Sequence, residues 1–241
     1  MEVLKFVLKG RNAFFKIPEV NTYYYFTYGN IHKVALLGIF GAVLGYDGYG
    51  QQKSEDDYPE FYRKLRNLSV SIVPQKNSKG YIAKRIQSFN NSVGYASQEQ
   101  GGNLIVKEQW LEQPEWEIYV KLDCEGAVAL KDALIQKKCI YMPYLGSNDH
   151  PADITEVEVL EGHECLEQEI EVLDSLFPAQ NIQMDEEDDD IVLFLYQEYL
   201  PVGMTKETNQ YCLEKMIFTN RPIKGHACPV YQVREKNIVF Y

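Results

Sequence analysis

The sequence lacks any apolar run long enough to cross a membrane. A transmembrane helix needs roughly 20 apolar residues, and the longest uncharged apolar stretch, from Val34 to Tyr46, is shorter and interrupted by glycine. The opening residues MEVLKFVLKG alternate apolar with polar side chains, which is typical of a strand and not of a signal peptide. We therefore predict a chain with no membrane span and a cytoplasmic location.

Cysteine is also scarce. The five cysteines form no CxxC pair, which disfavours a zinc cage and indicates a reducing compartment. His163 with Cys165, and His226 with Cys228, could each supply two metal ligands, but the two pairs lie in dissimilar segments and we interpret them as unrelated. The acidic run from Met184 to Asp190 is interpreted as a solvated loop. The sequence thus predicts no metal and no cofactor.

Familiar catalytic signatures are missing as well. The chain contains no P-loop, GxGxxG, GxSxG or HExxH motif. Its four histidines are scattered, and only His32 has a basic neighbour, Lys33. A histidine that cleaves RNA as a general base needs a cation close to the scissile phosphate, and the spacing reveals none. The sequence favours binding over catalysis, with a metal-independent endoribonuclease as the alternative function.

Basic residues are unevenly distributed along the chain. The formal net charge is -11, yet residues 1–90 hold 13 Lys and Arg against 7 Asp and Glu. Residues 91–200 hold 5 against 25, and residues 201–241 hold 6 against 3. Binding depends on the local field at the contacting face. The basic N-terminal third is therefore compatible with a nucleic-acid partner despite the overall charge.

The segment after the first predicted strand combines basic and aromatic residues. Gly10 ends the strand, and Lys9, Arg11 and Lys16 lie around it. The aromatic residues that follow are Phe14, Phe15, Tyr23, Tyr24, Tyr25, Phe26 and Tyr28. Such a mixture suits RNA, because rings stack on bases while cations contact phosphates. The run YYYF fits an edge strand equally well, because aromatic residues favour strands.

A glycine-spaced helix is predicted next, from Ile31 to about Tyr46, with Asn30 as its N-cap. Glycine destabilises a helix interior by up to about 1 kcal/mol relative to alanine, so Gly38, Gly41 and Gly45 indicate close approach of a sheet or another chain. His32 and Lys33 would stand in the first turn, where free N–H groups favour a phosphate. Two solvated side chains are the plainer alternative there.

The remaining pattern predicts an α+β chain. Residues 55–68 indicate a short helix and residues 68–75 a strand. The polar segment 76–103 suits an extended hairpin or a mobile loop, and residues 104–123 indicate two strands joined by a turn at Gln113 and Pro114. A helix over 125–138 would bury Val128, Leu130, Leu134 and Ile135, and further strands follow. A split β-α-β, ferredoxin-like core with added β-hairpins fits this order.

Four stretches resemble the Cas-five family, the RAMP-superfamily subunit of type I CRISPR Cascade complexes. They are FVLKGRNAFFKIPEVNTYYYFTYGNIHKVALLGIFGAVLG, VKEQWLEQPEWEIYVKLD, LKDALIQKKCIYMPYLGSNDHPADI and the loop GHACPVYQV. Their order and spacing cover nearly the whole chain and are most similar to type I-B members. The family has prolines where Ile31, His32 and Lys33 stand. Members that cleave RNA carry a Lys-His pair that this sequence lacks.

The resemblance implies an RRM-like ferredoxin domain with a projecting β-hairpin "thumb" at about 76–103 and added C-terminal β-strands. We expect residues 1–125 to form the N-terminal domain and 126–241 the remainder. It implies a subunit that caps the 5′ handle of the CRISPR RNA in antiviral defence, beside Cas-seven and Cas-eight subunits, with target DNA reached indirectly. The RNA-binding residues it implies are Arg11, Asn12, Lys16, Tyr28, His32 and Lys33 near the turn, and Lys84, Arg85, Asn90 and Asn91 in the thumb.

Overall fold

A six-stranded antiparallel sheet lies at the centre of the fold. The computed structural model describes residues 1–19, 23–75, 78–165, 170–184 and 193–241. The strand order is β14–β13–β7–β1–β6–β3. The strands are β1 (Glu2–Lys9), β3 (Val70–Pro74), β6 (Glu115–Lys121), β7 (Asp153–Glu164), β13 (Val230–Val233) and β14 (Lys236–Val239). β1 and β3 each pair antiparallel with β6 and therefore run in the same direction. Strands from both sides of residue 125 share this sheet.

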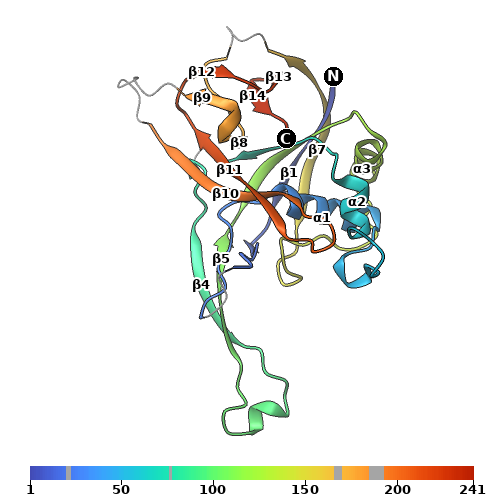
Figure 1. Ribbon diagram of the computed structural model, residues 1–241, viewed down its shortest axis with the longest axis vertical. Helices are drawn as coiled ribbons and strands as arrows, with labels where there is room; N and C mark the ends of the chain where they lie inside the picture. Colours follow the sequence, from blue (N-terminus) through green and yellow to red (C-terminus); the bar gives the residue numbers. More distant parts are fainter. Residues whose placement is uncertain (20–22, 76–77, 166–169, 185–192) are drawn as a thin grey trace.

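Three helices pack on one face of the sheet. They are α1 (Lys33–Leu44), α2 (Glu60–Leu65) and α3 (Glu125–Ile135), seen together on the right of Figure 1. Alternate residues of β1, including Phe6, point to the helices, and the ring of Phe6 meets that of Phe40 on α1 edge to face, with centroids 6.1 Å apart. The other residues of β1 point the opposite way, and Val3 joins a smaller core on the other face of the sheet. The prediction of a buried first strand is confirmed.

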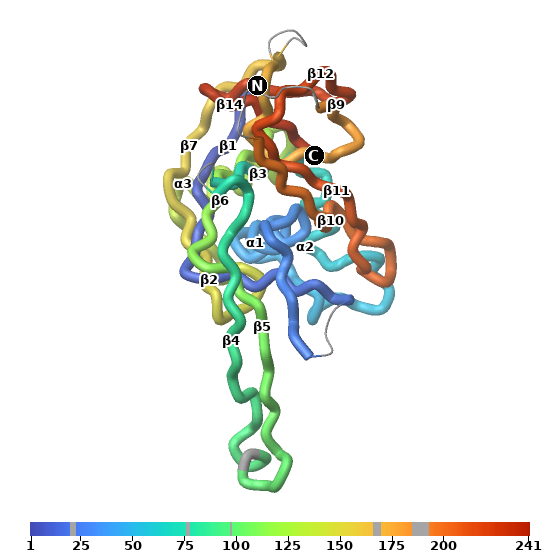
Figure 2. Tube along the Cα trace, turned by 90° about the vertical axis from the view of Figure 1, so that its left-hand side faces the viewer, coloured from blue at the N-terminus to red at the C-terminus, as the bar shows by residue number. Residues whose placement is uncertain are grey.

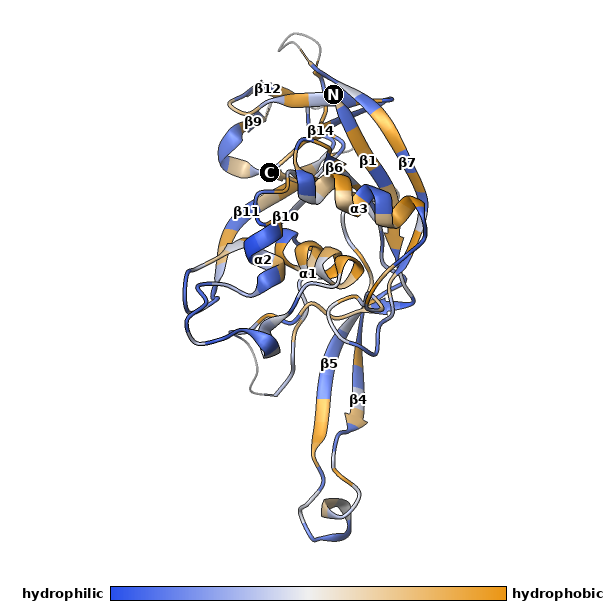
Figure 3. Ribbon diagram, turned by 90° about the vertical axis from the view of Figure 1, so that its right-hand side faces the viewer, coloured by the Kyte–Doolittle hydropathy of each residue, from blue (hydrophilic) through white to orange (hydrophobic). Residues whose placement is uncertain are grey.

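Two helix details differ from the prediction. The N-cap of α1 is His32, whose Nδ1 accepts a hydrogen bond from the Ala35 N–H at 3.2 Å, and not Asn30, which is fully buried. In α3 the buried residues are Ala127, Leu130 and Leu134. Val128 and Ile135 are exposed, because the apolar stripe of α3 is narrower than the predicted set. Figure 3 shows the contrast between the mostly apolar α1 and the polar α2.

The C-terminal part adds two smaller sheets. They are formed by β10 (Leu195–Met204), β11 (Tyr211–Thr219) and β8 (Phe177–Pro178), and by β12 (Ile223–His226) and β9 (Ile182–Met184). The GHACPVYQV stretch was predicted as a loop, but much of it is strand, because β13 pairs with both β7 and β14. The acidic run 185–190 lies outside the described residues. No helix within the described ranges is long and apolar enough to span a membrane.

A long hairpin leaves the body of the molecule. It consists of β4 (Lys84–Asn90) and β5 (Ile105–Glu112), and both views show it extending away from the sheets (Figures 1 and 2). The short strand β2 (Asn12–Ala13) pairs with the last residues of β5, Leu111 and Glu112, along the edge of β5 that does not pair with β4. β6 follows β5 after the turn at Gln113 and Pro114, as predicted. The hairpin therefore grows out of the central sheet beside the N-terminal loop.

Candidate nucleic-acid interface

The register of the hairpin decides which side chains share a face. Lys84 pairs with Leu111, Arg85 with Trp110 and Ser88 with Lys107. Successive residues of a strand point to opposite faces, and directly paired residues share one. Lys84 and Lys107 therefore lie on one face, separated along the hairpin by about four residues or roughly 13 Å. Arg85 lies on the other.

Cations stack against tyrosine rings on both sides of the hairpin base. Tyr25 forms a parallel bridge with Glu108 and so shares the Arg85 face, whereas Tyr24 points to the Lys84 face. The ammonium of Lys16 lies 4.0 Å from the centroid of the Tyr25 ring, and that of Lys107 lies 5.2 Å from the Tyr24 ring. Lys84 Nζ donates a hydrogen bond to the carbonyl oxygen of Thr27 at 3.3 Å. These five residues, Lys16, Tyr24, Tyr25, Lys84 and Lys107, are called here the hairpin-base surface. Cation–aromatic contacts of this kind hold charge and rings side by side in water.

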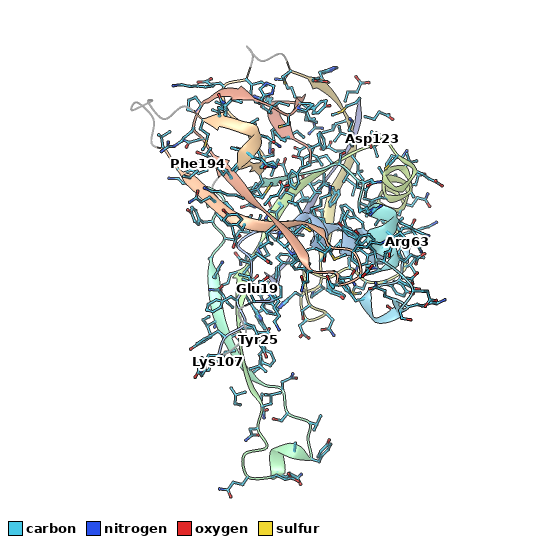
Figure 4. The ribbon with its side chains drawn as sticks, in the orientation of Figure 1. Glu19, Tyr25, Arg63, Lys107, Asp123 and Phe194 are labelled. Carbon is cyan, nitrogen blue, oxygen red and sulfur yellow. The ribbon has the colours of Figure 1, made fainter. Side chains whose placement is uncertain are left out.

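Main-chain pairing explains why the tyrosine run lies there. The N–H of Tyr25 donates to the Lys107 carbonyl at 2.9 Å, and the Gln109 N–H donates to the Tyr25 carbonyl at 2.9 Å. Figure 4 shows Tyr25 and Lys107 labelled where the hairpin leaves the body. The ring of Tyr23 is 84% exposed. The edge-strand interpretation is therefore confirmed at Tyr25, and stacking of the exposed rings on RNA stays a prediction.

The opposite face of the hairpin is acidic. Arg85 lies 3.7 Å from a carboxylate oxygen of Glu112, and the Trp110 Nε1–H donates to Glu108 at 2.8 Å. The edge of the Trp110 ring meets His150, with centroids 4.6 Å apart. Burial lowers the pKa of His150, partly offset by Asp149, so this imidazole is uncharged at neutral pH. The two basic neighbours Lys84 and Arg85 thus face different electrostatic environments.

The predicted residues at the start of α1 are largely enclosed. Burial lowers the pKa of His32 to about 3, and its side chain is packed among the rings of Phe15, Tyr28 and Tyr211 at centroid distances of 6.0, 5.2 and 5.4 Å. Tyr28 is also buried, and burial raises its pKa. Burial lowers the pKa of Lys33, opposed by Glu214. His32 therefore acts as an uncharged helix cap in this chain.

The remaining predicted residues lie along the edges of the hairpin. Asn12 belongs to β2 and pairs with Glu112, while the carbonyl of the exposed Arg11 accepts a hydrogen bond from the Gln113 N–H. Asn90 donates to Asn103 at 3.3 Å and accepts from the Ser92 N–H, and the Asn91 N–H donates to Leu104. The two asparagines thus help to close the far part of the hairpin.

Of the ten predicted residues, the structure places Lys16 and Lys84 beside Thr27 at the hairpin base and puts Lys84 and Arg85 on opposite faces. Sequence reasoning missed Lys107, whose position depends on the pairing between β4 and β5. The alternation IVKEQW contains the signal, but only the register with β4 shows that Lys107 shares a face with Lys84. No group of three or more His, Cys, Asp or Glu in the described part of the chain is placed to hold a metal.

Comparisons with known proteins show where else this fold occurs. No protein-family model matches the sequence, and no curated protein matches it. Among solved structures, a chain of a CRISPR RNA-guided surveillance complex aligns over 92% of this chain and 91% of its own, with 12% identity and a TM-score of 0.55. A CRISPR protein from Archaeoglobus fulgidus aligns over 99% and 98%, with 10% identity and a TM-score of 0.53. The chain has a mixed α+β fold shared with CRISPR-associated proteins.

Proposed function

We propose that the chain is a non-catalytic RNA-binding subunit of a CRISPR effector complex, of the Cas-five type and closest to type I-B. In this proposal, β7–β1–β6–β3 with α1 and α3 form a ferredoxin-like RAMP core. Its support is the order β-α-β-β-α-β along the chain, with β6 between the parallel strands β1 and β3. The β4–β5 hairpin would be the thumb.

The observation that carries the proposal is the hairpin-base surface. Three lysines and two tyrosines, drawn from three separate segments, gather around the edge of the hairpin where it leaves the body, with Tyr24, Lys84 and Lys107 on one face and Lys16 and Tyr25 on the other. Single-stranded RNA binds where aromatic rings can stack on bases and cations lie near the backbone. The surface therefore fits the 5′ handle of a CRISPR RNA. Cas-seven and Cas-eight subunits would flank it, and target DNA would be reached through the RNA.

Charge placement favours RNA on the Lys84 face over the Arg85 face. Arg85 is paired with Glu112, and Glu108 lies on the same face of β5. Phosphates would meet like charge there. On the hairpin-base surface the lysines contact rings and a carbonyl and have no carboxylate partner in the ion pairs of the described residues. RNA is thus expected to run along the Lys84 face.

The test measures binding of a fluorescent single-stranded RNA pool of about ten nucleotides to the purified full chain. Replacing Lys16, Lys84 and Lys107 together with alanine should weaken binding about 100-fold at low salt and reduce the dependence on salt, because each lost phosphate contact removes one released counterion. Arg85→Ala is the matched control, since it removes a neighbouring cation from the opposite face. Equal losses from Lys84→Ala and Arg85→Ala would contradict the assignment of the face.

The same RNA tests the enzymatic alternative. Incubation with the purified chain in EDTA should leave the RNA intact, because His32 is the helix cap and its pKa is too low for a base that exchanges protons near neutral pH. Cleavage that disappears in a His32→Ala variant would replace the binding proposal by an endoribonuclease.

A further inference from the structure

A cleft lies beside α1, away from the hairpin-base surface except at Lys16. Its volume is about 640 Å³. Ala35, Gly38 and Ala42 line it and lie at positions i, i+3 and i+7 of the helix, so they form one stripe. A Cβ added to Gly38 would have nothing within 4 Å. The small residues therefore leave open space on a helix face that larger side chains would fill.

The walls of the cleft are aromatic and partly exposed. Tyr46, Tyr49, Tyr141, Tyr144 and Tyr211 line it together with Met142. Tyr141 is 54% exposed, Met142 75% and the neighbouring Ile140 69%. Clustered exposed apolar side chains on a folded protein mark a contact surface for a protein, a ligand or a membrane. The loop at 140–144 thus extends the apolar cleft onto the outer surface.

The surroundings of the cleft are acidic. A second hollow of about 560 Å³ shares Tyr49 with the cleft and is lined by Glu55, Asp56, Asp57 and Glu207. A third hollow of about 710 Å³ shares Lys16, Tyr49 and Tyr211 and adds Glu19. Asp47 lines the cleft itself. Lys16 and Lys53 are the cations that line these three hollows, so carboxylates outnumber them.

We propose that this cleft docks an apolar segment of a second protein, flanked by lysine or arginine. The apolar residues would insert over Gly38 between the tyrosines, and the flanking cations would meet the carboxylates of the neighbouring hollows. The carboxylates favour a peptide with basic flanks over RNA, because they attract its cations and repel the phosphates of RNA. The inference uses residues other than the hairpin-base lysines, apart from Lys16, and therefore stands whether or not the chain binds RNA.

Gly38→Leu provides the sharpest test. The Cβ of a leucine at this position would have no atom within 4 Å, so its side chain would enter the cleft. Leucine is also a better helix former than glycine. The variant should therefore unfold at the same temperature as the wild type or higher. A phage-displayed library of random peptides of about 12 residues is selected on the full chain. Peptides that bind the wild type are then measured on Gly38→Leu.

We expect a class of peptides with two or three aromatic or aliphatic residues flanked by Lys or Arg, whose affinity falls at least about tenfold on Gly38→Leu. Asp56→Lys with Asp57→Lys should weaken the same class. Gln136→Leu, a leucine added at the end of α3, is the control and should change nothing. The proposal fails if no peptide class depends on Gly38, or if the dependent class is acidic. It also fails if Gly38→Leu weakens binding of single-stranded RNA instead, which would assign the cleft to RNA.

Discussion

The buried amide of Asn30 holds the turn that leads into α1. Asn30 is fully buried, and its side chain donates to the Gly80 carbonyl at 2.9 Å and accepts from the Trp116 Nε1–H at 2.9 Å. Trp116 belongs to β6, and Gly80 precedes β4. One amide therefore ties the N-terminal turn to both the central sheet and the beginning of the hairpin, which fixes the position of the hairpin base.

Asn30→Ala should lower the free energy of unfolding by about 2–4 kcal/mol, because it leaves a buried N–H and a buried carbonyl without partners. Urea denaturation of the full chain measures this loss. Asn67→Ala, at an exposed position before β3, should change stability by less than about 0.5 kcal/mol. A loss below about 1 kcal/mol for Asn30→Ala would show that water replaces the amide.

His32 makes stability depend on pH. Burial depresses its pKa to about 3, so between that value and the ordinary pKa of about 6.5 the unfolded chain binds a proton that the folded chain does not. Stability is therefore complete above about pH 6.5 and falls as the pH is lowered. Between about pH 7 and pH 5 this histidine should remove about 2 kcal/mol.

The comparison is with His32→Asn, which keeps a side chain able to cap the helix but does not titrate. Urea denaturation at both pH values should show a fall in wild-type stability that exceeds the fall in the variant by about 2 kcal/mol. Parallel changes in the two proteins would mean that His32 is protonated in the folded state.

At the scale of elements, the three glycines of α1 have three different roles. An added Cβ at Gly41 would lie 2.5 Å from the Cβ of Phe61 on α2, so this glycine permits close helix packing. Gly45 has φ 78 and ends the helix, a left-handed conformation that favours glycine. Gly38 faces the open cleft. The predicted close approach is thus confirmed at Gly41, but the partner is helix α2 of the same chain and not the predicted sheet or second chain.

Alanine at these positions should change stability in opposite directions. Gly38→Ala should raise the free energy of unfolding by about 0.5–1 kcal/mol, because alanine favours the helix and meets nothing. Gly41→Ala should lower it by about 1–3 kcal/mol through overpacking against Phe61. Thermal unfolding of both variants measures the difference. A stabilising Gly41→Ala would mean that α1 and α2 separate easily.

The sequence predicted elements better than it predicted their faces. β1, α1 and the turn between β5 and β6 follow from local alternation and turn residues. The N-cap of α1 could not be predicted from local residues, because histidine is outside the usual capping set. The split between Lys84 and Arg85 depends on register, and β13 became a strand through pairing with β7 and β14. The cleft draws its walls from distant segments, so no local pattern contains it.

At the scale of the molecule, two surfaces of opposite character meet near Lys16. The hairpin-base surface offers lysines and tyrosines, whereas the cleft offers tyrosines bordered by carboxylates. The formal charge of -11 is therefore a poor guide to the hairpin-base surface, whose lysines form no ion pair among the described residues. In the proposed function, one surface binds RNA and the other binds protein, so the chain would join the two in a ribonucleoprotein complex.

Photocrosslinking tests the central claim most directly. The full chain is irradiated with single-stranded RNA of about ten nucleotides that contains 4-thiouridine, and the attached peptides are mapped by mass spectrometry. The account predicts crosslinks at Tyr24 and on β5 around Lys107, and their loss when Lys16, Lys84 and Lys107 are replaced with alanine. Crosslinks confined to the Arg85 face, to α3 or to the cleft tyrosines Tyr141 and Tyr211 would contradict it.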